Sequence, residues 1–273
     1  MKKLTNEEMT GMERGVTLFN FDGGYKMQSF YSKENTEWVD LENIPNTNLL
    51  CEKNTIEQIK KKLRKKEHRI SFLGSGNYHY ASTLFLTDIR RPFTLVLFDH
   101  HPDSLPSPND SLISCGSWVL ESLKKLPLLK QVIMIGISSK TLEHIPYLYR
   151  KKIKVITEEE LPKMNSTYMN TLVSQIPTEL VYISIDKDVL HEREALTAWD
   201  HGSMSLEQVL AFTKQLIRNK EIYGLDVCGE FPVNPANEYL KVVKAAVKKN
   251  NQANHFILTH AMDWMRRKYK TIA

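Results

Sequence analysis

The feature that most constrains the fold is a regular alternation of short apolar runs with longer amphipathic stretches. Several runs are apolar almost throughout: residues 94–98 read TLVLF, residues 132–137 read VIMIGI and residues 180–185 read LVYISI. Runs of this length and composition are typical of parallel strands that are buried on both faces of a sheet. Their alternation with helical patterns indicates right-handed crossover connections. The chain is therefore predicted to be an α/β protein, with a three-layer α/β/α architecture around a central, mostly parallel sheet of about eight strands.

The predicted strands and helices account for most of the chain. Strands are predicted at residues 16–21, 69–73, 93–98, 131–137, 152–156, 180–185, 221–226 and 255–258. Helices are predicted at residues 55–66, 78–86, 114–125, 140–150, 166–173, 205–217 and 237–249. Residues 23–54 have the least regular pattern and are interpreted as an excursion that precedes the sheet. No repeat, low-complexity tract or linker divides the sequence, so residues 1–273 are predicted to form a single domain.

Composition excludes several classes of protein. Hydrophobic residues at 41% and charged residues at 25% are ordinary globular values, so the disordered and fibrous classes are excluded. Three scattered cysteines are too few for a disulfide framework or a zinc ribbon. The first residues lack the apolar stretch of a secretory signal, and no apolar run is long enough to cross a membrane. A cytoplasmic protein without a membrane partner is therefore expected.

Part of the net charge of +5 comes from the basic run KKKLRKK at residues 60–66. Such a run can bind nucleic acid. Here it belongs to a predicted helix in which Ile56, Ile59 and Leu63 share one face, so the lysines are interpreted as its solvated side. Since no recognition motif or interleaved aromatic residue accompanies the run, nucleic acid is not an expected partner.

Residue types that bind metals follow four of the predicted strands, at the point where each strand ends. They occur in the sequences GSGNYHY (residues 74–80), DHHPD (99–103), DKD (186–188) and DVCGE (226–230). Because ligands bind at the carboxyl ends of parallel strands, these side chains are expected to lie at one edge of the sheet.

Each of these motifs has a more ordinary interpretation when it is taken alone. Asp186 and Asp188 could belong to a turn or a helix cap, and His79 could be an ordinary hydrogen-bonded histidine. Taken together the motifs favour a bound cation, because a buried charge costs several kcal/mol unless it is paired or bound to metal. Carboxylates and imidazoles without a cysteine predict hard or borderline divalent ions, and carboxylates can bridge two of them.

The ordered motifs GSGNYHY, DHHPD, SIDKD and DVCGEFP resemble the signature of the arginase/agmatinase/formiminoglutamase (ureohydrolase) superfamily, and the chain looks like a divergent member. The resemblance extends over residues 70–232. It implies a site for two divalent metal ions per chain, either Mn²⁺, which is the first expectation, or another divalent metal. The ligands of one ion would be His79, Asp99, Asp103 and Asp186, and those of the other Asp99, His101, Asp186 and Asp188. Asp103 would also keep the attacking hydroxide aligned.

The resemblance also implies a reaction. In this family a hydroxide that bridges the metals attacks a guanidino-type carbon, and the tetrahedral intermediate collapses to urea and an amine. The chain is therefore expected to hydrolyse a C–N bond of a small guanidino or amidino compound, a linear amidine. Glu230 would bind the cationic group of that substrate through charge-assisted hydrogen bonds. The resemblance leaves the substrate open, makes arginase activity itself the less expected choice, and is compatible with a homo-oligomer.

The chain departs from the family pattern in ways that bear on the reaction. Asn77 stands where the family usually has an aspartate, and His100 replaces an alanine, so that a titratable side chain lies beside the predicted ligands. Lys187 replaces an apolar residue between Asp186 and Asp188, and strand alternation predicts that it points away from both.

The most consequential departure is at Cys115, which stands nearest to the position where the family has a proton-transferring histidine. A thiol can transfer protons when its pKa is depressed, and it can also be an inert buried residue, so Cys115 is a candidate catalytic residue with both interpretations open. Glu230, His100 and His191 are candidate substrate-binding residues, the last in a loop that also contains Asp200 and His201. Glu230 and Asp103 are, with Cys115, also the candidate catalytic residues.

Three hypotheses for function follow. The first is the metal-dependent C–N hydrolase. The second is a metal-binding ureohydrolase-like protein without ureohydrolase activity, which the loss of the histidine permits. The third is a metal-dependent deacetylase or amidohydrolase, which also uses aspartate and histidine ligands at strand ends; the paired aspartates Asp186 and Asp188 argue for two ions rather than the single zinc of such a site.

Overall fold

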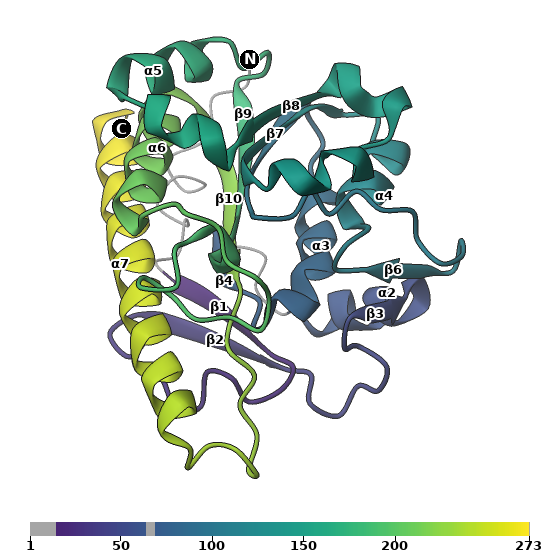
Figure 1. Ribbon diagram of the computed structural model, residues 1–273, viewed down its shortest axis with the longest axis vertical. Helices are drawn as coiled ribbons and strands as arrows, with labels where there is room; N and C mark the ends of the chain where they lie inside the picture. Colours follow the sequence, from purple (N-terminus) through teal and green to yellow (C-terminus); the bar gives the residue numbers. More distant parts are fainter. Residues whose placement is uncertain (1–14, 64–68, 273) are drawn as a thin grey trace.

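The structure is a computed structural model that describes residues 15–63 and 69–272. Within these residues the chain forms an eight-stranded sheet in the order β2-β1-β4-β10-β9-β5-β7-β8, with parallel pairing throughout (Figure 1). The strands are β1 (Gly15–Asn20), β2 (Asn35–Asp40), β4 (Ile70–Phe72), β5 (Phe93–Phe98), β7 (Leu129–Ile137), β8 (Ile153–Thr157), β9 (Leu180–Asp186) and β10 (Glu221–Cys228). β3 (Leu50–Glu52) and β6 (Leu112–Ser114) pair in a separate antiparallel ribbon. The predicted architecture is confirmed.

Helices cover both faces of the sheet (Figure 1). They are α2 (Lys53–Lys62), α3 (Thr83–Leu86), α4 (Trp118–Lys125), α5 (Ser166–Ser174), α6 (Leu206–Asn219) and α7 (Lys241–Ile272). On one face, Phe212 of α6 and Ile257 of α7 share a core cluster with the sheet. On the other face, Leu84 of α3 and Trp118 of α4 belong to a second core cluster. Burial on both faces explains why the central strands are apolar almost throughout.

Short 3₁₀ segments connect several of these elements. They are η1 (Gly76–Ser82), η2 (Ser139–His144), η3 (Tyr147–Lys152), η4 (Glu158–Lys163) and η5 (Lys187–Val189). The helix predicted at residues 140–150 is in fact η2 and η3, separated by Pro146, and the helix predicted at residues 78–86 begins within η1. The helix predicted at residues 55–66 is described only as far as Lys62, and residues 64–66 lie outside the described part. In α2, Ile59 is buried while Lys61 and Lys62 are exposed, as its amphipathic pattern predicts.

One predicted strand is wrong. Residues 255–258 lie inside α7, where Ala253, Ile257 and Ala261 recur at every fourth position and are buried. A short apolar run fits a strand and a buried helical stripe equally well, and packing decides between them. α7 begins at Lys241, later than predicted, and has 32 residues. Among the described helices, neither α7 nor any other is long and apolar enough to cross a membrane.

The interpretation of residues 23–54 as an excursion is also wrong in part, because this segment contains β2. Strand β2 pairs with β1 at the edge of the sheet, and Val39 is its buried residue. An edge strand with so little buried surface carries no apolar run, so hydrophobic periodicity does not detect it.

Candidate metal centre

The predicted ligands meet at the carboxyl ends of four neighbouring strands. β4, β10, β9 and β5 are consecutive in the sheet, and the residues that follow them lie at one edge. Candidate ligand atoms form groups in which each atom lies within 4.8 Å of the others. The groups are His79, Asp99 and Asp103; Asp99, His101 and Asp188; and His79, Asp186 and Cys228. Because Asp99 and His79 are each shared by two groups, the six predicted ligands form one cluster, with Cys228 as an addition.

The imidazole of His79 is surrounded by carboxylates. Its Nδ1 atom lies 3.1 Å from an oxygen of Asp103, 3.3 Å from one of Asp99 and 3.5 Å from one of Asp186. Nδ1 of His79 and Oδ2 of Asp99 are buried, and neither forms a hydrogen bond with any described residue. Buried polar atoms without hydrogen bonds are costly, and a divalent cation between them would satisfy both. The donor set therefore fits a metal ion.

Crowding of the carboxylates perturbs their pKa values. Burial, followed by the charges of Asp186 and Asp99, raises the pKa of Asp188 well above its ordinary value. Burial and Asp99 raise the pKa of Asp103 to about 7. Divalent cations bound here would offset the repulsion between these groups and favour their ionised forms.

His101 lies between the cluster and an outer carboxylate. Its Nδ1 atom is 3.0 Å from Asp188 Oδ2, and its Nε2 atom is 2.9 Å from Asp200 Oδ1. A carboxylate on the far nitrogen of a metal-binding histidine orients the ring and increases its basicity. Sequence analysis placed Asp200 only in a nearby loop. In the structure its carboxylate lies at the far nitrogen of His101, where it can orient that ring.

A buried chain of hydrogen bonds selects the tautomer of His79. Asp226 accepts hydrogen bonds from the hydroxyls of Tyr182, at 2.7 Å, and Ser184, at 2.6 Å. Because the single hydroxyl proton of Ser184 is used there, its oxygen accepts from Nε2–H of His79, 2.9 Å away. When His79 is neutral, its Nδ1 lone pair then faces the carboxylates, as a metal ligand requires. Sequence analysis did not assign Ser184 or Asp226 a role, although each lies two residues before a side chain of the cluster.

Replacing Ser184 with alanine is expected to weaken metal binding by about 10- to 100-fold, because His79 loses the acceptor that holds its tautomer and orientation. Calorimetric titration of the metal-free variant with Mn²⁺ measures the change. Thr94→Val is the matched control, since Thr94 makes a buried hydrogen bond with Thr178 at the opposite end of β5. An unchanged Mn²⁺ affinity in Ser184→Ala would remove the orienting role of Ser184.

Two glycines allow the backbone to approach the carboxylate of Asp186 closely. A Cβ atom at Gly76 would lie 2.9 Å from Asp186 Oδ2, and one at Gly229 would lie 2.5 Å from Oδ1. Gly229 also has a φ of +91°, which L-residues with side chains rarely adopt. The space around Asp186 therefore depends on the absence of a side chain at both positions.

The cluster forms the wall of a cavity of ≈ 370 Å³. The lining residues are Gly76, Asp99, His101, Pro102, Asp103, Leu105, Ser114, Cys115, Gly116, Thr141, His144, Asp186, Asp188 and Trp199. Thr141 and His144 come from η2 and Trp199 from a loop; neither segment carries a motif, so sequence analysis missed them. A cavity of this size accommodates a small molecule beside the metal ligands.

Cys115 lines this cavity, as its candidate catalytic role requires. Burial, followed by the charge of Asp103, raises the pKa of its thiol to about 12. The thiol therefore carries its proton at neutral pH. Because proton transfer by a thiol needs a depressed pKa, this raised value favours the inert interpretation of Cys115 over the catalytic one.

Glu230 is not among the residues that line the cavity. Its buried carboxylate forms an ion pair with Lys187. It also accepts hydrogen bonds from the amides of Asn254 at 2.7 Å, Gln28 at 2.7 Å and Asn250 at 3.2 Å. Lys187 lies in η5 rather than in β9, and its Nζ atom bonds to Glu230 and Asn254 rather than to Asp186 or Asp188. A lysine in a buried strand end needs a buried acidic partner, which is the signal that could have identified this pair.

His100 and His191 also lie outside the cavity lining. The ring of His100 is buried, with Nδ1 3.7 Å from Glu158 Oε2 and Nε2 3.7 Å from Asp200 Oδ2. Nδ1 of His191 accepts a hydrogen bond from the backbone of Arg193, 3.0 Å away, within its own turn. The structure therefore does not bring these two candidate substrate-binding residues to the cavity.

The amino-acid sequence is similar to that of a known protein family. The arginase family model matches residues 13–255. An uncharacterized protein of Thermotoga maritima is 32% identical over 161 residues, which is 59% of this chain and 58% of that protein's length.

Several solved structures share the fold. A hypothetical agmatinase from Burkholderia thailandensis has a TM-score of 0.63 at 16% identity, over 94% of this chain and 87% of that chain. Formimidoylglutamase from Bacillus subtilis has a TM-score of 0.64 at 15% identity, over 93% of this chain and 87% of that chain. Arginase from Bacillus caldovelox has a TM-score of 0.62 at 13% identity, over 91% of this chain and 98% of that chain. At these identities the similarity establishes the fold alone.

Proposed function

Because the chain belongs to the arginase family, we propose that it is a metal-dependent hydrolase that cleaves a C–N bond of a small guanidino or amidino compound. The observation that carries this proposal is the buried His79 Nδ1 atom, which lies within 3.5 Å of three carboxylates in the wall of the cavity. Such a set of nitrogen and oxygen donors is suited to divalent ions such as Mn²⁺.

We assign the ligands of two ions as the family resemblance implies. One ion would be held by His79, Asp99, Asp103 and Asp186, and the other by Asp99, His101, Asp186 and Asp188. In support, candidate ligand groups share Asp99, and Asp186 Oδ1 accepts a hydrogen bond from the backbone of Asp188, 3.0 Å away. Two divalent ions, when bound, would act as Lewis acids and lower the pKa of a bound water, so that a hydroxide nucleophile is available at neutral pH.

Residues of the chain orient the reacting groups around this centre. Trp118 Nε1 donates a hydrogen bond to Asp103 Oδ2 over 2.6 Å, and Asp103 has a φ of 47°. The indole and the backbone together hold the Asp103 carboxylate at the cavity wall, where it accepts a proton from a nucleophilic water. Cys115 lines the same cavity, but the raised pKa of its thiol favours an inert residue over a proton donor.

A metal-dependent amidohydrolase acting on a neutral amide is the second candidate. The position of Glu230 favours it, because the carboxylate expected to bind a cationic guanidinium is instead paired with Lys187. A neutral amide needs no such partner, whereas a guanidinium is bound best by a free carboxylate.

Metal analysis combined with a substrate panel tests the proposal. Protein purified without chelators is expected to contain about two divalent ions per chain and to release urea, ammonia or an amine from one of the guanidino, amidino or amide compounds. An Asp188→Asn variant controls for contaminating activity. Release from amides alone would select the second candidate. Protein that binds no divalent ion under any condition would overturn both.

A further inference from the structure

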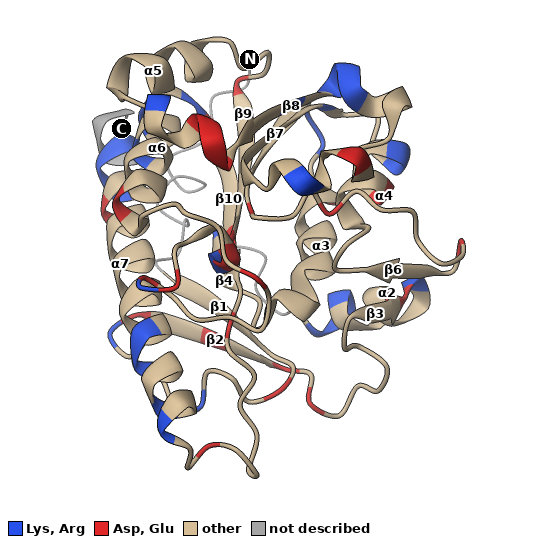
Figure 2. Ribbon diagram, viewed as in Figure 1, with Lys and Arg blue, Asp and Glu red and all other residues tan. Residues whose placement is uncertain are grey.

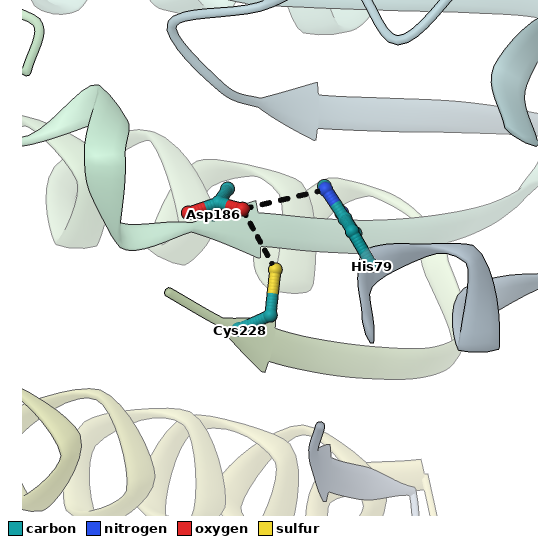
Figure 3. A group of neighbouring side chains, drawn as sticks. All are labelled: His79, Asp186 and Cys228. Carbon is teal, nitrogen blue, oxygen red and sulfur yellow. Dashed lines mark hydrogen bonds and ion pairs between the residues drawn. The ribbon is translucent and has the colours of Figure 1, made fainter. Parts of the chain in front are cut away.

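Cys228 lies at the end of β10, directly beside a predicted metal ligand. The sheet register pairs Cys228 with Asp186 of β9, so the two side chains lie next to each other across the strands. The thiol is buried and donates a hydrogen bond to Asp186 Oδ2 over 3.0 Å. The cysteine sulfur, the Asp186 oxygen and a ring nitrogen of His79 all lie within 4.8 Å of one another (Figure 3).

A second observation at the same place points to a bound ligand. His79 is 1% exposed, and its buried Nδ1 atom has no hydrogen-bond partner among the described residues. That nitrogen lies 3.5 Å from the same Asp186 oxygen to which the thiol donates. Nitrogen, oxygen and sulfur donors from η1, β9 and β10 therefore surround one position.

We propose that Cys228 is a ligand of the ion held by His79 and Asp186, and that this position therefore binds a thiophilic divalent cation such as Zn²⁺. The inference rests on the metal centre of the proposed function. When the ion binds, the S–H bond breaks, the sulfur lone pair forms the bond to the metal, and the proton passes to solvent. No electron is transferred.

This ligand makes the two metal positions chemically different. The group that contains His101 offers carboxylate and imidazole donors, Asp99 and Asp188, which suit Mn²⁺. The position beside Cys228 adds a thiolate, which favours Zn²⁺ over Mn²⁺. The expectation drawn from the sequence, that no cysteine belongs to the ligand set, is thereby revised.

The other two cysteines provide matched controls. The thiol of Cys51 donates to the backbone carbonyl of Glu52 at 3.5 Å, and Cys115 lines the cavity beside Gly116. Neither belongs to a group of candidate metal ligands within the described residues. Replacing either of them removes a thiol without touching the proposed sulfur ligand.

Cobalt substitution tests the inference directly. Titrating the metal-free protein with Co²⁺ is expected to produce a sulfur-to-cobalt charge-transfer band in the near ultraviolet. The band is expected to be lost in Cys228→Ser and kept in Cys51→Ser and Cys115→Ser. Zn²⁺ affinity should fall by at least about tenfold in Cys228→Ser, with a smaller loss for Mn²⁺, because only the softer ion depends on the thiolate.

Zinc-edge X-ray absorption of the wild-type protein tests the same ligand without a variant. A sulfur atom is expected at about 2.3 Å from the bound Zn²⁺. Co²⁺ or Zn²⁺ that binds without a sulfur signal would overturn the inference and leave the proposed function standing, with Cys228 as a hydrogen-bond donor to Asp186. A band that survives in Cys228→Ser would also overturn it. Protein that binds no divalent ion would overturn the inference together with the proposed function.

Discussion

Asp186→Asn is expected to reduce turnover by about 10³-fold, equivalent to about 4 kcal/mol, because the proposed ligand assignment has the Asp186 carboxylate shared by both metal positions. Its Oδ2 atom lies 3.5 Å from His79 Nδ1, and its Oδ1 atom holds the turn that carries Asp188 through a hydrogen bond of 3.0 Å. Asparagine preserves the shape of the side chain and removes its charge. Metal content and steady-state kinetics, measured on the substrate that the panel identifies, check this expectation.

The stability of the metal-free variant separates a loss of metal binding from a loss of fold. Asp186 helps to raise the pKa of Asp188, so its removal relieves repulsion within the cluster. Metal-free Asp186→Asn should therefore unfold at the same temperature as the wild type or higher, and lose the stabilisation that added metal gives the wild type. Asp263→Asn, a change on α7 at a side chain that is 45% exposed, is the control. Full activity in Asp186→Asn would exclude Asp186 as the shared ligand.

Lys187→Met is expected to lower the free energy of unfolding by about 3–5 kcal/mol, since it leaves the buried carboxylate of Glu230 without its cation. Lys187 is 0% exposed and Glu230 is 2% exposed, so water cannot take the place of the missing partner. Lys187 Nζ also donates to Asn254 of α7 over 3.0 Å, so the pair links the metal-binding end of β9 to that helix. Urea unfolding followed by circular dichroism measures the loss.

The double variant Lys187→Met with Glu230→Gln distinguishes an ion pair from general packing. Each single change should cost several kcal/mol, and the double variant should recover most of that cost, because neither charge is then buried alone. The glutamine amide oxygen can still accept from Asn254, which donates to Oε1 of Glu230, whereas the bond from Gln28 to Oε2 is lost. Strictly additive losses would show that Lys187 and Glu230 do not stabilise the protein as a pair.

The position of Glu230 also bears on the choice of substrate. Its carboxylate is satisfied by Lys187 and by the surrounding amides, which are buried in part by α7. In Figure 2, many of the positions coloured as Lys or Arg lie on helical segments such as α7, and the ribbon of the sheet strands is mostly tan. Because Glu230 is paired with Lys187, a substrate panel that includes neutral amides also tests whether the site lacks a free carboxylate for a cationic substrate.

The sequence by itself determined the sheet and the edge at which the ligands gather. Apolar runs such as residues 94–98 and 180–185 mark buried parallel strands, and the polar residues after them must lie at the carboxyl edge. These properties depend on periodicity and on chain direction, which are local. For the same reason the sequence misread residues 255–258 and overlooked β2, whose assignments depend on packing against other elements.

Only the tertiary structure decided which side chains meet. Lys187 pairs with Glu230, 43 residues away, and Cys228 contacts Asp186, 42 residues away. The first pairing withdraws an expected substrate-binding carboxylate from the cavity, and the second brings a sulfur atom to the metal ligands. Both depend on the register of β9 against β10 and on the packing of α7, since buried polar groups take the partners that these contacts bring within reach. No pattern within either segment alone contains that information.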